Sequence, residues 1–342
     1  MNSRERVRKA IHFGSPDRVP IRNQVMDAAL HEHGRKLPDL YRTHPGDFGD
    51  PAPAEIPGPR PEDILPDGSY RRVETDSWGV EWEFLKFGIM GHPLKRPLDR
   101  IENLAAYWPP APPAMAGAAF AAEKEAVRKL KETSYCLRGW LTIFETLHSV
   151  RNFEAVLMDV MDDAPAIHAL ADLILDYRLK EAEYHLALGA DGIMLADDWG
   201  TQRSLLIGKD AWRSFFKPRY AKLIRMIKAA GADVFFHSCG HILPLLPDLA
   251  ELGVDVFWPQ MSAHDHGQLA EAARRHHLCL ELHMDRQQLM TFGTPAQIDA
   301  AVAAARKTFG RADGGILWHA EIDNGFPFEN IQALLAAFQK YA

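Results

Sequence analysis

Short apolar segments alternate with longer amphipathic segments throughout the part of the chain that follows residue 130. The apolar segments have the length of buried strands, and the segments between them show the spacing of apolar residues that marks a helix. Strands that alternate with helices form parallel sheets, because each helix carries the chain back to the start of the next strand. The expected strands cover residues 134–137, 192–195, 233–236, 255–258, 278–282 and 315–318.

The helices expected between these strands follow the same alternation. One of them begins at Thr294-Pro295, where threonine can cap the helix and proline suits its first turn. The others cover residues 141–150, 164–190, 210–230, 242–252, 269–276 and 328–341.

The part before residue 131 is less regular. We expect a helix over 4–11, a first strand over 18–21, and a hairpin over 71–84 that turns near Trp78-Gly79. Segments 44–68 and 109–117 are rich in proline and glycine, which is typical of loops or of lids over a site.

The number of strands decides between two α/β architectures. Six strands follow residue 130 and one or two precede it, and eight would close a barrel. An open doubly wound sheet would carry a glycine-rich phosphate loop after its first strand, and neither G-x-G-x-x-G nor a Walker pattern occurs. We therefore expect a (β/α)8 TIM barrel with an N-terminal extension and long loops, forming one domain over 1–342.

Charge and cysteine content exclude several classes of protein. A net charge of −7 does not suit a nucleic-acid-binding face. Three cysteines do not make a disulfide framework, which favours a reducing compartment. There is no apolar stretch near the roughly 20 residues that span a bilayer, and the N-terminus lacks the apolar core of a signal peptide. We expect a cytoplasmic protein and leave its oligomeric state open, with a homodimer among the options.

Polar residues follow the expected strands at the point where each strand ends. In a parallel barrel the active site lies at this carboxyl end, so the residues there are candidates for chemistry. Those expected to contact substrate are Arg138, Trp199, Gln260 and His283.

The segment His237-Ser238-Cys239-Gly240 is the sharpest of these candidates. Residues two apart on an extended chain point to the same side, so an imidazole and a thiol could face one ion. Zinc accepts that mixture, and catalytic zinc sites use about three protein ligands. Gly240 would allow a sharp turn behind the ligands. The alternative is a buried cysteine beside a core histidine.

The third zinc ligand is open at this stage. His319 is the first choice because it ends the last strand, and His283 and Glu321 are the alternatives. Cys279 lies too early in its strand to reach the rim and is expected in the core.

The adjacent carboxylates Asp197-Asp198 are candidates for acid–base chemistry, because such a pair can hold a proton or orient a ligand. Aspartate also caps turns well, so we expect one of the two to be functional and the other structural. Asp285 could likewise be either a functional carboxylate or the cap of a turn.

The chain also resembles the uroporphyrinogen decarboxylase-like superfamily, along nearly its whole length. That resemblance implies a (β/α)8 barrel. The motifs that carry it are Pro16-Asp17-Arg18-Val19-Pro20, Asp76-Ser77-Trp78-Gly79-Val80, Asp197-Asp198-Trp199-Gly200-Thr201-Gln202, Phe236-His237-Ser238-Cys239-Gly240, Leu245-Leu246-Pro247-Asp248-Leu249 and Pro327-Phe328-Glu329-Asn330-Ile331.

Within this superfamily the H-x-C-G segment resembles the methyltransferase branch. Members of that branch use zinc to activate a thiol or another acceptor and exchange methyl groups with a corrinoid, and His237 and Cys239 match their ligands. The decarboxylase signature P-x-W-x-M-R-Q-A-G is absent from residues 19–24. The branch takes its next ligand from a late cysteine, which residues 315–325 lack, so His319 or Glu321 would have to replace it.

The resemblance therefore implies a zinc-dependent methyltransferase. It would move a methyl group between a corrinoid and a small donor or acceptor such as tetrahydrofolate, a thiol or a methoxylated compound. The D-x-H-x-x-G signature of corrinoid-carrying domains is absent, so a partner protein would carry the corrinoid. The alternatives are a carboxy-lyase acting on a polycarboxylate and a non-catalytic corrinoid- or tetrapyrrole-binding homologue.

Overall fold

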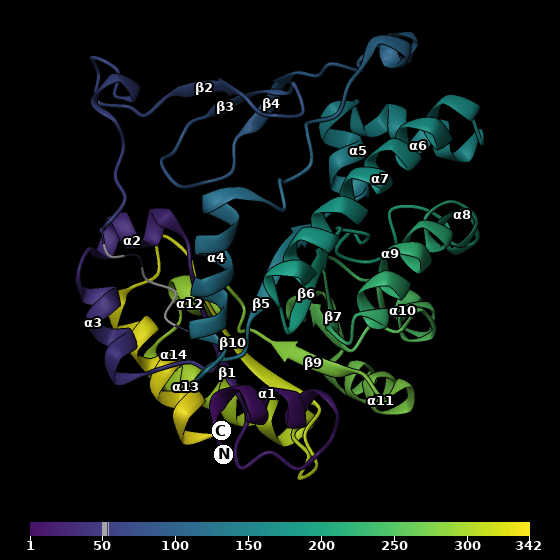
Figure 1. The fold of residues 1–342 in the computed structure, drawn as a ribbon. Helices are drawn as coiled ribbons and strands as arrows, with labels where there is room; N and C mark the ends of the chain where they lie inside the picture. Colours follow the sequence, from purple (N-terminus) through teal and green to yellow (C-terminus); the bar gives the residue numbers. More distant parts are fainter. Residues whose placement is uncertain (50–52, 54) are drawn as a thin grey trace.

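A curled sheet of seven parallel strands, with helices packed outside it, forms the centre of the molecule (Figure 1). The computed structural model describes residues 1–49, 53 and 55–342. The strand order β1-β10-β9-β8-β7-β6-β5 confirms a TIM-barrel-type fold, with six strands after residue 130 and one before it. The strands are β1 (Ile21–Val25), β5 (Leu137–Leu141), β6 (Gly192–Ala196), β7 (Asp233–Ser238), β8 (Val256–Pro259), β9 (Cys279–Leu282) and β10 (Ile316–Ile322).

The helices that follow these strands bury the outer face of the sheet, and most begin and end close to the expected positions. Among the described helices, none combines the length and the apolar character that a membrane-spanning segment needs. The helices are α1 (Ser3–Ile11), α2 (Asp27–His33), α3 (Lys36–Thr43), α4 (Gly117–Leu130), α5 (Phe144–Val150), α6 (Phe153–Met161), α7 (Pro165–Leu188), α8 (Lys209–Phe215), α9 (Lys217–Ala229), α10 (Leu246–Leu252), α11 (His266–His276), α12 (Leu289–Phe292), α13 (Pro295–Phe309) and α14 (Phe328–Lys340).

Several expected boundaries were wrong. The last strand runs to Ile322 rather than ending at 318, so His319 lies within it. The first strand begins at Ile21 rather than at 18, after Pro20, which has no N–H to donate to the ladder. The helix expected over 210–230 is two helices, and Pro218 starts the second one in its first turn. The strand expected over 134–137 is β5, which begins only at Leu137.

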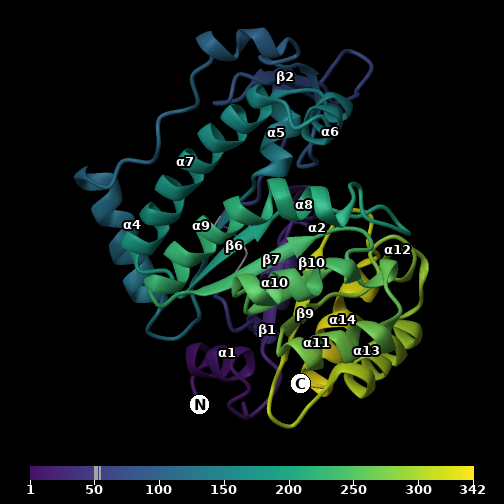
Figure 2. The same ribbon diagram turned by 90° about the vertical axis from the view of Figure 1, so that its right-hand side faces the viewer.

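A small antiparallel sheet lies at the opposite end of the molecule from α1 (Figures 1 and 2). The hairpin expected over 71–84 is confirmed as β2 (Arg72–Thr75) and β3 (Glu81–Phe84). A third strand, β4 (His92–Lys95), was not expected, because Pro93 argues against a strand except at an edge, which is where β4 lies. Val80 and Leu98 are fully buried in the main core, so this sheet is anchored to the barrel.

Helix α1 fills the amino end of the barrel. Its apolar face packs against side chains that point inward from five neighbouring strands. The carboxyl end, which we call the mouth, is the end that carries the polar residues expected at the strand ends. The buried cluster that includes this face of α1 contains Val7, Ala10, Ile11, Tyr135, Met194, Phe235, Val256, Trp258, Cys279 and Leu317, which confirms Cys279 as a core residue.

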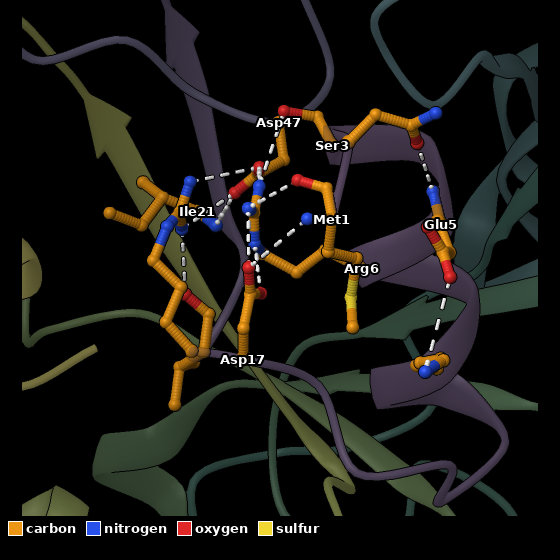
Figure 3. Close-up of polar contacts among 11 residues, drawn as sticks. Met1, Ser3, Glu5, Arg6, Asp17, Ile21 and Asp47 are labelled. Carbon is orange, nitrogen blue, oxygen red and sulfur yellow. Dashed lines mark hydrogen bonds and ion pairs between the residues drawn. The ribbon is translucent and has the colours of Figure 1, made fainter.

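Asp47 links the two edge strands β1 and β5 near the amino end of the barrel, where the described residues form no eighth strand. Its backbone N–H donates to the Ile21 carbonyl at 2.7 Å, and its carbonyl accepts from the Tyr135 N–H at 2.9 Å. Its fully buried carboxylate accepts from the Ile21 N–H at 2.8 Å, from Arg6 at 2.7 Å and from Arg18 at 2.9 Å. Figure 3 shows the Arg6 guanidinium between the carboxylates of Asp47 and Asp17. Asp47 thus links β1 to the segment that precedes β5.

We predict that Asp47→Ala lowers the free energy of unfolding by about 3–5 kcal/mol, because it leaves two guanidiniums without their buried partner. Chemical denaturation would measure this change. Asp39→Ala removes a carboxylate from an exposed pair with Arg42 and should change stability little. An equal effect of the two substitutions would contradict the role of Asp47.

Candidate functional site

His237 and Cys239 lie at the end of β7, with their side chains facing each other. The Cys239 Sγ is 3.4 Å from the His237 Nε2. The His237 Nδ1 lies 3.1 Å from the Trp258 carbonyl oxygen and therefore carries the proton it donates there, which leaves the lone pair of Nε2 directed at the sulfur. A neighbouring carbonyl that fixes the ring in this way is typical of metal-binding histidines.

The turn that follows Cys239 depends on two glycines. Gly240 has a φ of +77°, and a Cβ on it would lie 2.1 Å from the carbonyl oxygen of Gly200. The Gly200 N–H donates to the Cys239 carbonyl at 3.2 Å, so the loop after β6 crosses directly over the turn after β7. This crossing brings the loop that carries Asp198 to the sulfur.

The two adjacent aspartates after β6 have different surroundings. The Asp197 carboxylate is buried and accepts from the backbone N–H groups of Ile143 and Glu145 and from the Tyr220 hydroxyl, so it fixes the start of α5. Burial raises the pKa of Asp197 to about 7. The Asp198 carboxylate instead accepts from the Cys239 N–H at 2.7 Å and lies 3.7 Å from the His237 Nε2.

These contacts bring together three side chains that could share one cation. Ligand atoms of Asp198, His237 and Cys239 all lie within 4.8 Å of one another. Asp198 was expected as an acid–base residue rather than as a ligand, because nothing in the spacing along the chain places it beside Cys239. The set combines one carboxylate oxygen, one imidazole nitrogen and one sulfur, all of which bind zinc.

Burial controls the protonation of the two central groups. It lowers the pKa of His237 to about 3, so the imidazole is neutral and able to bind a cation. Burial, together with the nearby Asp198 carboxylate, raises the pKa of the Cys239 thiol to about 12. The thiol is therefore no free nucleophile at neutral pH, and it needs a cation beside it to become a thiolate.

The sequence profile of the uroporphyrinogen decarboxylase (URO-D) family matches residues 80–341. This chain belongs to the uroporphyrinogen decarboxylase family. No curated protein matches the sequence.

This URO-D family member also resembles solved structures, and the similarity covers the whole chain. A methyltransferase from Methanosarcina mazei covers 100% of this chain and 99% of its own, at 15% sequence identity and a TM-score of 0.70. A B12-independent methionine synthase from Shewanella sp. W3-18-1 covers 90% of this chain and 85% of its own, at 13% identity and a TM-score of 0.45. The first of these similarities shows that the fold is shared from end to end.

The other expected metal ligands, His319, Glu321 and His283, lie outside the group formed by Asp198, His237 and Cys239. His319 is fully buried, with its ring 4.3 Å from that of Trp258, which is itself 4.0 Å from the ring of His237. The Glu321 carboxylate accepts from His283 at 3.2 Å and from Arg286 at 2.7 Å. Burial by itself would raise the pKa of Glu321, but the contacts with His283 and Arg286 together have the larger effect, so the pKa is lowered.

The residues expected to contact substrate fall into different places. The Gln260 side-chain oxygen accepts a hydrogen bond from the Gly240 N–H at 2.7 Å, and His283 is buried beside Glu321. Trp199 does not reach the mouth, because its ring is 1% exposed and stacks on Phe144 in the core.

Two further candidates, Arg138 and Asp285, lie in surroundings that differ from those expected of residues at strand ends. Arg138 lies within β5 rather than after it, and it pairs with Glu123. The Asp285 carboxylate accepts from the N–H groups of Gln287 and Gln288, so it stabilises a turn.

Sequence reasoning missed two residues of the mouth, Trp140 and Arg286. The half-exposed indole of Trp140 lies 5.8 Å from the His237 ring, between ring centroids. Arg286 binds Glu321. The position of Arg286 directly after Asp285 could have identified it, whereas Trp140 faces the mouth only because of a bulge in β5.

We predict that Asp197→Asn lowers the free energy of unfolding by about 1–3 kcal/mol, since an amide cannot accept all three of these hydrogen bonds. Thermal or chemical denaturation would measure the loss. Metal content should not change, because Asp197 faces the start of α5 rather than the sulfur. A variant that loses metal but keeps its stability would contradict this assignment.

Proposed function

We propose that this URO-D family member is a zinc-dependent methyltransferase that exchanges a methyl group between a small molecule and a corrinoid on a partner protein. One observation carries the proposal: the Cys239 sulfur and the His237 nitrogen lie 3.4 Å apart at the barrel mouth, with the Asp198 carboxylate in reach of the same ion. The full-length similarity to a methyltransferase from Methanosarcina mazei supports it.

The donor atoms of this site fit zinc better than they fit calcium or magnesium. A sulfur and an imidazole nitrogen are ligands that the hard cations avoid, whereas zinc accepts both beside a carboxylate. A zinc ion bound there would act as a Lewis acid on a thiol or on the oxygen of a methyl ether.

Neighbouring groups of the chain hold the proposed ligands in position. The Trp258 carbonyl orients the His237 ring, and the Asp198 carboxylate holds the backbone of Cys239. Gln260 fixes the turn at Gly240 from the neighbouring strand. Since all of these contacts are in place before any substrate enters, the site is preorganised, and a substrate held beside it would lose little further freedom on reacting.

We propose Asp198 as the third ligand. Its carboxylate already lies in the group with His237 and Cys239, whereas Glu321 is held by His283 and Arg286. Glu321 remains the alternative from the opposite side of the mouth, and His319, the first choice from sequence, would have to pass Trp258.

The carboxy-lyase alternative finds less support in the charges of the mouth. A polycarboxylate needs cationic partners, and the Arg286 guanidinium of the mouth is already paired with Glu321 and lies 3.7 Å from Asp323. A second carboxylate, Asp198, lies beside the sulfur. A multiply charged anion would therefore meet acidic groups at this end of the barrel.

We predict about one zinc ion per chain in the purified wild type and far less in Cys239→Ser. Elemental analysis would measure both. Cys279→Ala removes a thiol from the buried interior cluster and serves as the matched control, which should keep its zinc. Equal zinc in wild type and Cys239→Ser would remove the ligand assignment and the proposed function with it.

Comparing variants of the two carboxylates, Asp198 and Glu321, tests which of them is the third zinc ligand. We predict that Asp198→Asn weakens zinc binding by more than the roughly 10–100-fold that loss of an outer-shell group costs. Glu321→Gln should stay within that range. Zinc titration against a chromophoric chelator would measure both affinities, and the reverse order would assign the ligand to Glu321.

A further inference from the structure

The bulge in β5 turns a tryptophan into the barrel mouth. Along β5 and β6 the register runs Leu137 to Gly192 and Arg138 to Ile193, and then jumps to Leu141 opposite Leu195. One residue on β5 is therefore extra. Gly139, within the jump, has a φ of +82°, a conformation that favours glycine.

The extra residue reverses which side chains of β5 face inward. Leu137 packs against the interior cluster, so regular alternation would place Leu141 inside and Trp140 outside. Instead, Leu141 is buried in the outer core between the sheet and the helices. The Trp140 ring faces inward, 5.8 Å from the ring of His237 and 6.0 Å from that of Trp258.

Trp140 keeps much of its surface free in this position. Its side chain is 47% exposed, whereas Trp258 and Trp199 are at most 2% exposed. A large aromatic surface left open beside a candidate metal ligand is available to a bound molecule.

The charges of the mouth indicate which kind of molecule fits. Glu321 is paired with Arg286 and His283, and Glu145 lies 3.0 Å from His148. The Asp198 carboxylate accepts from the Cys239 N–H. These ionisable groups of the mouth each have a partner within the chain, and the rings that the Trp140 indole approaches are those of His237 and Trp258, which favours a flat, neutral ligand against it.

We propose that Trp140 stacks on the aromatic ring of the substrate and places a methoxy group on that ring beside His237 and Cys239. This inference rests on the proposed function, since it names the substrate class of the same site. It makes Trp140 the residue that selects aromatic over aliphatic methyl ethers.

A matched pair of probes tests the proposal. Methoxybenzene and methoxycyclohexane carry the same ether and differ in the flatness of the ring. Ligand-observed NMR titrations would give the dissociation constant of each probe. We expect wild type to bind methoxybenzene about tenfold more tightly, since stacking is worth up to about 1.5 kcal/mol beyond area burial.

Three variants make the test specific. Trp140→Phe should keep most of the preference, and Trp140→Leu should lose it. Trp108→Leu removes an indole that is 83% exposed and should behave like wild type. Absence of methoxybenzene binding to wild type, or an unchanged preference in Trp140→Leu, would overturn the proposal. So would a Trp140→Leu protein that loses zinc and stability but keeps its preference, because Trp140 would then be structural only.

Cys239→Ser separates this inference from the proposed function. We expect it to lose zinc while it still prefers methoxybenzene, because the stacking surface does not include the sulfur. A wild type without zinc that still prefers the aromatic probe would end the metal assignment and leave Trp140 as an aromatic-binding residue.

Discussion

One buried residue, Asp47, links the two edges of the curled sheet near helix α1, and its carboxylate ties that helix to the same seam. Seven strands leave a seam between β1 and β5, which Asp47 bridges with its backbone on both sides. Its side chain also binds Arg6, so the seam and the helix that fills the amino end are fixed together. Residues of the mouth come from strands all around the wall, from Trp140 on β5 to Glu321 on β10, and their separations follow from its curl.

The interior of the barrel is apolar near α1 and polar toward the mouth. Buried in this interior are Glu281, which is bound by Arg22 at 2.8 Å, and His319, whose Nδ1 lies 3.4 Å from a Glu281 oxygen and whose Nε2 has no hydrogen-bond partner among the described residues. Burial raises the pKa of Glu281 and lowers that of His319. Each unsatisfied buried polar group costs about 1–3 kcal/mol. A polar layer that costs stability in this way is expected where function, rather than packing, selects the residues.

The position of some site residues could be predicted from the sequence, and that of others could not. The spacing of His237 and Cys239 predicted that they would face each other, because alternation along a strand is a local property. The partner that joins them could not be predicted, since Asp198 reaches the sulfur only where two glycine-dependent turns cross. Trp199 was misplaced for a related reason: position after a strand does not say whether a large ring turns inward to the mouth or outward to the helices.

By itself, the sequence determined the alternation of strands and helices after residue 130, the barrel-type fold and the rim on which the polar residues gather. These follow from periodicity and turn chemistry, which neighbouring residues fix. Only the tertiary structure decided that Asp47 links the two edges of the sheet, that Asp198 rather than His319 lies beside the sulfur, and that a bulge turns Trp140 into the mouth. Each of those depends on register and packing between segments far apart in the chain, which no local pattern records.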